Sequence, residues 1–104
     1  MMNYCMIETA FDDKTELEQV VKELLDNKLV ASCQVVASDS KWNWKNELEK
    51  SKEYLLFMKT KKNLAKEIFE TIKKFHSYEC FEFAIFELNS CNDEYIKWLE
   101  QEVK

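Results

Sequence analysis

The chain has 104 residues and contains neither glycine nor proline. Every turn must therefore use residues such as Asn, Asp, Ser or Lys, including any position with a positive φ angle. Loops that cradle phosphate groups need glycine so that backbone amides can approach the ligand, as in the Walker and dinucleotide-binding motifs. Both of these nucleotide-binding classes are excluded.

The charged residues are 20 acidic residues and 15 basic ones, and every basic residue is lysine. Nucleic acids are held by clustered positive charge, and their bases are read most often by arginine. An acidic chain without arginine lacks both features. We therefore expect no nucleic acid as a partner, and no anionic membrane surface.

Length and cysteine usage limit the organisation of the chain. A sequence of 104 residues has room for one domain, spanning 1–104. The four cysteines, Cys5, Cys33, Cys80 and Cys91, form no C-x-x-C pair and no zinc-ligand spacing, so reduced thiols are favoured over disulfides. No segment has the pattern of a signal peptide or the ~18 consecutive apolar residues of a membrane span, and the expected location is the cytoplasm.

Three segments have the signals of helices. Asp13 and Glu16 have the spacing of a capping box, and Asn27 is expected to end that helix in the left-handed conformation. Asn63 or Thr60 is the expected cap of the second helix. The apolar stripes of these two helices are Leu17, Val20, Val21, Leu24 and Leu25, then Leu64, Ile68, Phe69, Ile72 and Phe75. A short third helix follows Asn92 or Asp93 and carries Tyr95, Ile96, Leu99 and Val103 on one side.

The remaining segments are typical of β-strands. Strands are expected at 4–9, at 29–37, at 54–58 and at 80–88, and the alternation continues through Trp42 and Trp44 to make a long hairpin. The order is strand, helix, strand, strand, helix, strand, helix. This is the split βαβ or ferredoxin-like order, an α+β fold with two helices on one face of an antiparallel sheet and a short C-terminal helix.

The strand around Leu56 indicates self-association. Tyr54, Leu56 and Met58 alternate with the apolar Leu55 and Phe57, so a monomer would expose one apolar set on the face that the helices do not cover. The expected interface comprises Trp42, Trp44, Tyr54, Leu56 and Met58, together with Trp98 on the last helix. The alternative is that the C-terminal helix covers this face by itself.

Several motifs then give the sequence a resemblance to the CutA family of divalent-cation-tolerance proteins. The segment 40–48, SKWNWKNEL, is similar to the family pattern Ser-Ile-Tyr-x-Trp-x-Gly-Lys-Ile, and 56–60, LFMKT, resembles the family strand that ends in Ile-Lys-Thr. The segment 76–82, HSYECFE, corresponds to His-Pro-Tyr-x-x-Pro-Glu. The segment 95–99, YIKWL, resembles Tyr-Leu-x-Trp-Leu.

The departures from the family pattern are also informative. Asn46 stands where the family has the glycine of the hairpin, and Asn tolerates positive φ. Ser77 and Phe81 replace two prolines, so the loop is expected to be held less tightly. Glu8 replaces a cysteine that is a proposed copper ligand in relatives. The cysteine of the family's Leu-Ala-Ala-Cys segment is displaced by one position, to Cys33.

The resemblance implies a homotrimer with an architecture similar to that of PII signalling proteins, and a role in tolerance to copper or other divalent cations. No cofactor is implied as a requirement. The candidate metal site is His76 with Glu82, Glu8 and Glu79, a set suited to Cu(II) or another divalent cation. The alternative for His76 is a structural role at the end of the second helix.

A second function stays open beside the metal-related one. It is a PII-like regulatory module that binds a small molecule or a partner protein in clefts between subunits. An enzyme is not expected, because the single histidine has no evident nucleophile as partner.

Overall fold

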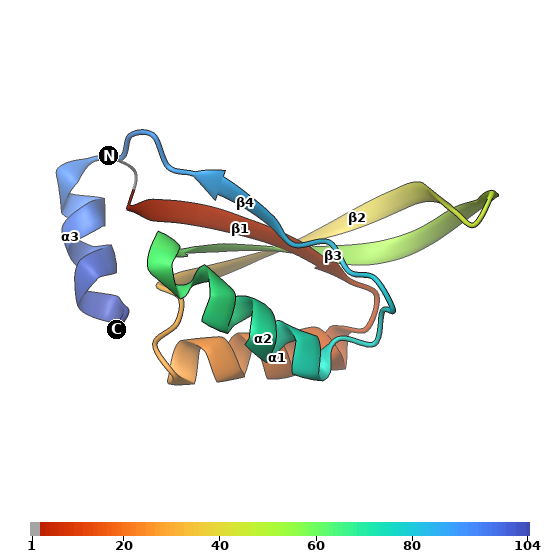
Figure 1. Ribbon diagram of the computed structural model, residues 1–104, viewed down its shortest axis with the longest axis horizontal. Helices are drawn as coiled ribbons and strands as arrows, with labels where there is room; N and C mark the ends of the chain where they lie inside the picture. Colours follow the sequence, from red (N-terminus) through yellow and green to blue (C-terminus); the bar gives the residue numbers. More distant parts are fainter. Residues whose placement is uncertain (1–2) are drawn as a thin grey trace.

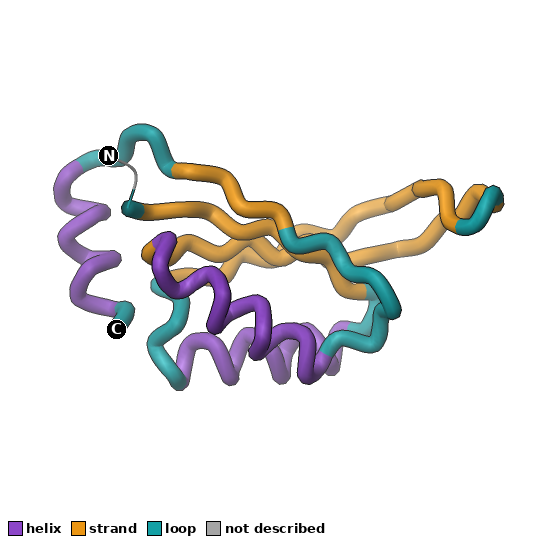
Figure 2. Tube along the Cα trace, viewed as in Figure 1, coloured by secondary structure: helices purple, strands orange, loops and turns teal. Residues whose placement is uncertain are grey.

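The computed structural model describes residues 3–104, so Met1 and Met2 of the predicted domain lie outside the described residues. The elements follow one another along the chain in Figures 1 and 2. They are β1 (Tyr4–Phe11), α1 (Lys14–Asp26), β2 (Ser32–Trp44), β3 (Glu47–Lys61), the 3₁₀ helix η1 (Lys62–Leu64), α2 (Ala65–Phe75), β4 (Ala84–Glu87) and α3 (Asp93–Glu102).

The four strands form one antiparallel sheet in the order β2-β3-β1-β4. Helices α1 and α2 lie on the same side of this sheet (Figure 1). The arrangement confirms the predicted α+β fold and its split βαβ order. Strands β2 and β4 are the two edges, and β1 lies between β3 and β4.

Helix α1 begins where the sequence predicts. The Asp13 side chain accepts a hydrogen bond from the Glu16 backbone N–H at 3.1 Å. The capping box is only half formed, because the Glu16 carboxylate instead accepts from the backbone N–H of Ser77 at 2.7 Å. This contact ties the start of α1 to the loop that follows α2.

The ends of the helices differ from the prediction at two points. The left-handed residue after α1 is Lys28, with φ of 56°, whereas Asn27 has φ of −90° and donates from its side-chain amide to the Glu23 carbonyl. Neither Thr60 nor Asn63 caps α2. The Thr60 hydroxyl is buried and donates to the Leu29 carbonyl at 2.6 Å, while η1 leads directly into α2.

The core lies between the sheet and the two helices. Leu56 and Met58 are completely buried there. The prediction that these two residues form a trimer interface is wrong, because the helices of the same chain already cover them. Leu55 and Phe57 occupy the opposite face of β3 and are partly exposed. The sheet therefore has one face that the helices cover and one open face, and β3 places apolar side chains on both.

Helix α3 lies at the end of the sheet where β1 begins, away from the long hairpin (Figure 1). It buries Leu99 in the core and joins β1 through the Tyr4 hydroxyl, which donates to the Glu100 carboxylate at 2.5 Å. Within residues 3–104, no helix has the length and apolar character needed to cross a bilayer.

Strands β2 and β3 form a hairpin that extends well past the rest of the sheet (Figure 2). Its turn consists of Lys45 and Asn46, with φ of 49° and 68°. Two central residues with positive φ are typical of a type I′ turn, whose twist matches that of the flanking strands. The predicted role of Asn46 in place of glycine is confirmed. The predicted strand at 80–88 is much shorter, since β4 spans only four residues.

The left-handed Lys28 predicts that Lys28→Gly stabilises the protein, because glycine adopts positive φ without the steric cost that a Cβ atom brings. We expect a gain of about 0.5–1 kcal/mol in the free energy of unfolding, measured by urea denaturation. Glu70→Gly, inside α2, is the matched control and should destabilise by about 1 kcal/mol. Equal losses in both variants would contradict the assignment.

Candidate functional site

His76 is the C-cap residue of α2, and its imidazole ring is fully buried. The Tyr78 backbone N–H donates to Nδ1 at 3.2 Å, so Nδ1 carries no proton. Nε2 then carries the proton and donates it to the Ala10 carbonyl at 2.6 Å. The ring also stacks between Phe11 and Phe81, with centroid distances of 4.2 and 4.8 Å.

Both nitrogens of His76 are therefore occupied, and neither is free to bind a metal ion. The predicted ligand role of His76 is wrong for the subunit, and the structural alternative holds instead. Its ring fixes the start of the loop from α2 to β4 against the end of β1. Across residues 3–104, no three His, Cys, Asp or Glu side chains converge in a way that could hold a metal ion.

Two of the other predicted residues do meet. Glu82 lies beside Glu8, which is opposite Ala84 in the pairing of β1 with β4. Partial loss of hydration, then a hydrogen bond with Glu8, and then the charges of Glu8 and Glu53 raise the pKa of the largely exposed Glu82 carboxyl. Glu79 is exposed in the preceding loop. The structure thus brings Glu8 and Glu82 together and keeps His76 apart from them.

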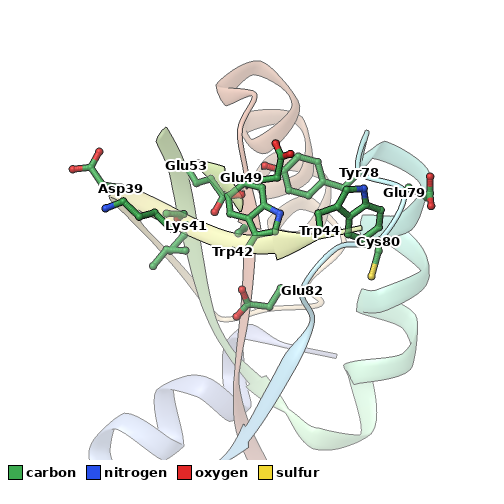
Figure 3. A pocket seen from close by; sticks show the side chains of 13 residues that line it. Asp39, Lys41, Trp42, Trp44, Glu49, Glu53, Tyr78, Glu79, Cys80 and Glu82 are labelled. Carbon is green, nitrogen blue, oxygen red and sulfur yellow. Dashed lines mark hydrogen bonds between the residues drawn. The ribbon is translucent and has the colours of Figure 1, made fainter. Parts of the chain in front are cut away.

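A cleft of about 720 Å³ opens at the root of the hairpin. Residues from the hairpin form one wall and the loop from α2 to β4 forms another, with Trp42 between them (Figure 3). The lining residues are Ala10, Asp39, Ser40, Lys41, Trp42, Trp44, Glu49, Glu53, Leu55, Tyr78, Glu79, Cys80 and Glu82.

The strand register explains why these residues share one face. Trp42 pairs with Glu49, and Ser38 pairs with Glu53, so these side chains project from the open face of the sheet. Ala10 pairs with Leu55 on the same face. The floor of the cleft is therefore apolar, and its hairpin wall carries acidic and aromatic groups.

Glu53 is the most buried carboxyl group in this cleft, with only 7% of its surface exposed. It accepts a hydrogen bond from the Tyr78 hydroxyl at 2.6 Å. Burial, followed by the hydrogen bond and charge of Glu53, raises the pKa of Tyr78, so the phenol keeps its proton. In the described part of the chain, no basic side chain forms an ion pair with Glu53.

The three tryptophans do not share one surface. Trp42 and Trp44 line the cleft, and the Lys45 ammonium lies 5.4 Å from the centre of the Trp44 ring. Trp98 lies on α3, where it packs against Tyr95 at a centroid distance of 5.5 Å. An interface made by all three would thus have to involve both the hairpin and the opposite end of the sheet.

Comparison with known proteins identifies the family. Residues 5–102 match the family described as CutA1 divalent ion tolerance protein. This chain belongs to the CutA1 family. The divalent-cation tolerance protein CutA of Pyrococcus horikoshii is 31% identical over 99 residues, which cover 95% of this chain and 97% of the relative. The CutA of Thermococcus kodakarensis is 31% identical over 98 residues, 94% of each chain.

Solved CutA1 structures also share the fold. The crystal structure of CutA1 from P. horikoshii superposes with a TM-score of 0.90 at 30% identity, covering 96% of this chain and 98% of that one. The CutA of Archaeoglobus fulgidus, described as periplasmic, shows the same fold with a TM-score of 0.93 at 23% identity, covering 97% and 99%. The cytoplasmic location of the present chain stays a prediction.

Sequence reasoning missed Glu53 and Tyr78 in this CutA1 chain. Glu53 stands at the end of a polar run and carries no signal of burial in the sequence. Tyr78 lies 25 residues further along the chain, and only the fold brings its hydroxyl to the carboxylate. One signal was available, because Tyr78 belongs to the His-x-Tyr segment that resembles the family pattern.

The cysteines of this CutA1 chain are free thiols. Burial raises the pKa of Cys33 to about 12, so its thiol stays protonated at neutral pH. Because the thiolate is the form that binds metal ions, Cys33 is a poor ligand. Cys80 is exposed at the cleft.

The buried ring of His76 predicts how His76→Ala behaves. Loss of the stacked ring and two hydrogen bonds should reduce the free energy of unfolding by about 2–4 kcal/mol, measured by thermal or urea denaturation. Titration of Cu(II), followed by calorimetry below the unfolding transition, should give the same affinity for the variant and the wild type. A loss of Cu(II) binding with unchanged stability would restore His76 as a ligand.

The raised pKa of Glu82 predicts a pH-dependent effect on stability. A carboxyl whose pKa is raised by folding favours the folded state below its unfolded pKa, and this contribution is lost as pH rises through the folded pKa. Glu82→Gln should therefore be more stable than the wild type at pH 7.5, by less than about 1 kcal/mol because Glu82 is exposed. The difference should vanish near pH 4, whereas Glu70→Gln on α2 should show no such trend.

Proposed function

We propose that the chain is a subunit of a CutA-type homotrimer that takes part in tolerance of, or response to, divalent cations, copper among them. Family membership supports the role, because the similar proteins from Pyrococcus and Thermococcus are named divalent-cation tolerance proteins. The observation that carries the assembly is the exposed apolar surface at both edges of the sheet.

Strand β2 is a 13-residue edge strand with Val35 and Val36 exposed by 46% and 50%. Strand β4, the other edge, exposes Ile85 and Phe86 by 47% and 46%. Unpaired edges with apolar side chains favour pairing with another chain. Because the two edges differ, a contact between β2 of one copy and β4 of the next is heterologous, and such contacts form a ring when the rotation from one copy to the next closes after three subunits.

The open face of the sheet supports the same assembly. Val36, Leu55 and Phe57 are exposed or half-buried on this face, opposite the helices. A ring of subunits would cover this surface, which an isolated monomer would leave in water. Trp42, Trp44 and Tyr54 remain the proposed contributors from the hairpin, and Trp98 from α3.

The role in cation tolerance does not operate through a metal site at His76, since that ring has no free nitrogen. A separate observation supports a second candidate function. The cleft of about 720 Å³ at the hairpin root has the size of a small-molecule site. This favours a PII-like module in which neighbouring hairpins complete ligand clefts between subunits.

The assembly predicts a solution mass of about 37 kDa, three times the 12.5 kDa of the chain, in sedimentation equilibrium at micromolar concentration. Val35→Lys places a charge on the β2 edge and should shift the mass toward one subunit. Leu25→Lys, on the exposed side of α1 with a similar exposure of 42%, is the matched control and should leave the mass unchanged. A wild-type mass near 12.5 kDa would exclude the homotrimer.

A further inference from the structure

We propose that His76 is a pH-dependent switch for residues 77–83, the loop between α2 and β4. The loop is closed while the imidazole ring is neutral, and it is released from Tyr78 onward when the ring gains a proton. The switch lies in the hydrogen bonds of one buried ring, so it requires neither the proposed assembly nor a ligand in the cleft.

The closed loop needs a neutral imidazole ring at His76. Nε2 donates its proton to the Ala10 carbonyl at 2.6 Å, and Nδ1 accepts a hydrogen bond from the Tyr78 backbone N–H at 3.2 Å. A second proton would convert Nδ1 from an acceptor into a donor, and two N–H groups would then face each other. The hydrogen bond from Tyr78 is therefore incompatible with an imidazolium ring.

Glu16 offers the protonated ring an alternative partner. Its Oε1 atom lies 3.6 Å from Nδ1 of His76, and its side chain is only 15% exposed. In the closed loop this oxygen accepts a hydrogen bond from the Ser77 backbone N–H at 2.7 Å. A charged ring would be drawn toward the carboxylate, because opposite charges attract more strongly where water is largely excluded. Protonation thus exchanges the Tyr78 N–H for the Glu16 carboxylate as the partner of Nδ1.

The other groups around His76 do not take the place of Glu16. Phe11 from β1 and Phe81 from the loop cover the two faces of the ring and offer no counter-charge. The other charged residues of the surrounding segments are Asp12, Lys14, Glu53, Lys73, Lys74 and Glu79. Among residues 3–104, Glu16 provides the only carboxylate within 4.0 Å of a ring nitrogen of His76.

The loop depends on Tyr78 because few other polar contacts hold its backbone. Tyr78 is bound at two points, through its N–H to His76 and through its hydroxyl to Glu53 on β3. In the described part of the chain, the backbone of residues 79–83 makes no hydrogen bond to another element. A segment with so few backbone hydrogen bonds has low local stability. Loss of the bond to His76 is therefore expected to open the loop while the helices and the sheet stay folded.

The direction of the effect follows from the number of bound protons. The released loop binds one proton more than the closed loop, so its population rises as the pH falls. Histidine side chains change their charge between about pH 5 and 8. The contribution of His76 to loop order is thus expected to be present at about pH 8 and to be lost toward about pH 5.

The test follows the full chain by ¹⁵N NMR between about pH 8 and pH 5. Spectra of the His76 ring report the protonation of Nδ1, and hydrogen exchange gives the protection factor of the Tyr78 amide, corrected for the intrinsic exchange rate. We expect Nδ1 to gain a proton over this range and the protection factor to fall by about tenfold or more. The control is the Asn27 amide, which bonds to the Glu23 carbonyl at the end of α1 and should keep its protection.

Two variants test the roles of the ring and of its alternative partner. Glu16→Gln keeps an oxygen for the Ser77 N–H but removes the counter-charge, so release should require a pH lower by about one unit. Glu18→Gln, an exposed position on α1, is the matched control and should keep the wild-type midpoint. His76→Phe retains a ring for stacking but has no nitrogen, so the Tyr78 amide should be poorly protected at every pH. If His76→Phe does not fold, the midpoint of Glu16→Gln decides.

Several results would overturn the switch. One is unchanged protection of the Tyr78 amide while the His76 ring gains its proton, and another is a ring that stays neutral at about pH 5. Equal losses of protection at Tyr78 and Asn27 would show acid unfolding of the whole chain in place of a local release. Equal midpoints in Glu16→Gln and Glu18→Gln would show that the charge of Glu16 plays no part in the exchange of partners.

Discussion

The pairing of β2 with β3 over thirteen residue pairs is the constraint on which the rest of the structure depends. Because side chains alternate between the two faces, this register decides at once which residues enter the core and which face outward. It buries Leu56 and Met58 under the helices and directs Leu55 and Phe57 to the open face. A slip by one residue would exchange the two sets. The same register pairs Trp42 with Glu49 on the part of the hairpin that extends past the sheet, where the two residues form one wall of the cleft.

The loop between α2 and β4 forms the second wall, and His76 holds it in place. The sequence lacks both prolines of the similar family segment, from which a looser loop was expected. The structure shows what replaces their rigidity. Phe81, at one of the two positions, stacks on the buried His76 ring, and the Ser77 backbone, at the other, donates to Glu16. Aromatic stacking and a hydrogen bond thus supply a constraint that proline supplies through its fixed φ angle.

Much of the fold could be predicted from the sequence because its apolar residues are strongly periodic. The buried stripes of α1 and α2 and the Asn46 turn were predictable, since each depends on residues close together in the chain, although Leu25 of the predicted α1 stripe is exposed. The N-terminal cap of α2 was not predictable, because the Thr60 hydroxyl donates a hydrogen bond to the Leu29 carbonyl, which is distant in the sequence. Sequence alone also could not decide which apolar set of β3 faces the helices. Both sets have similar hydrophobicity, and only packing against α1 and α2 distinguishes them.

The candidate site shows why a list of metal-binding residue types is a weak predictor of a metal site. His76, Glu8 and Glu82 come from neighbouring segments, yet the imidazole is directed into the core by the Ala10 carbonyl and the Tyr78 amide. The remaining carboxyl groups of the hairpin stand on strands whose ladder fixes their separation. Bringing three of them onto one ion would require breaking backbone hydrogen bonds of the hairpin.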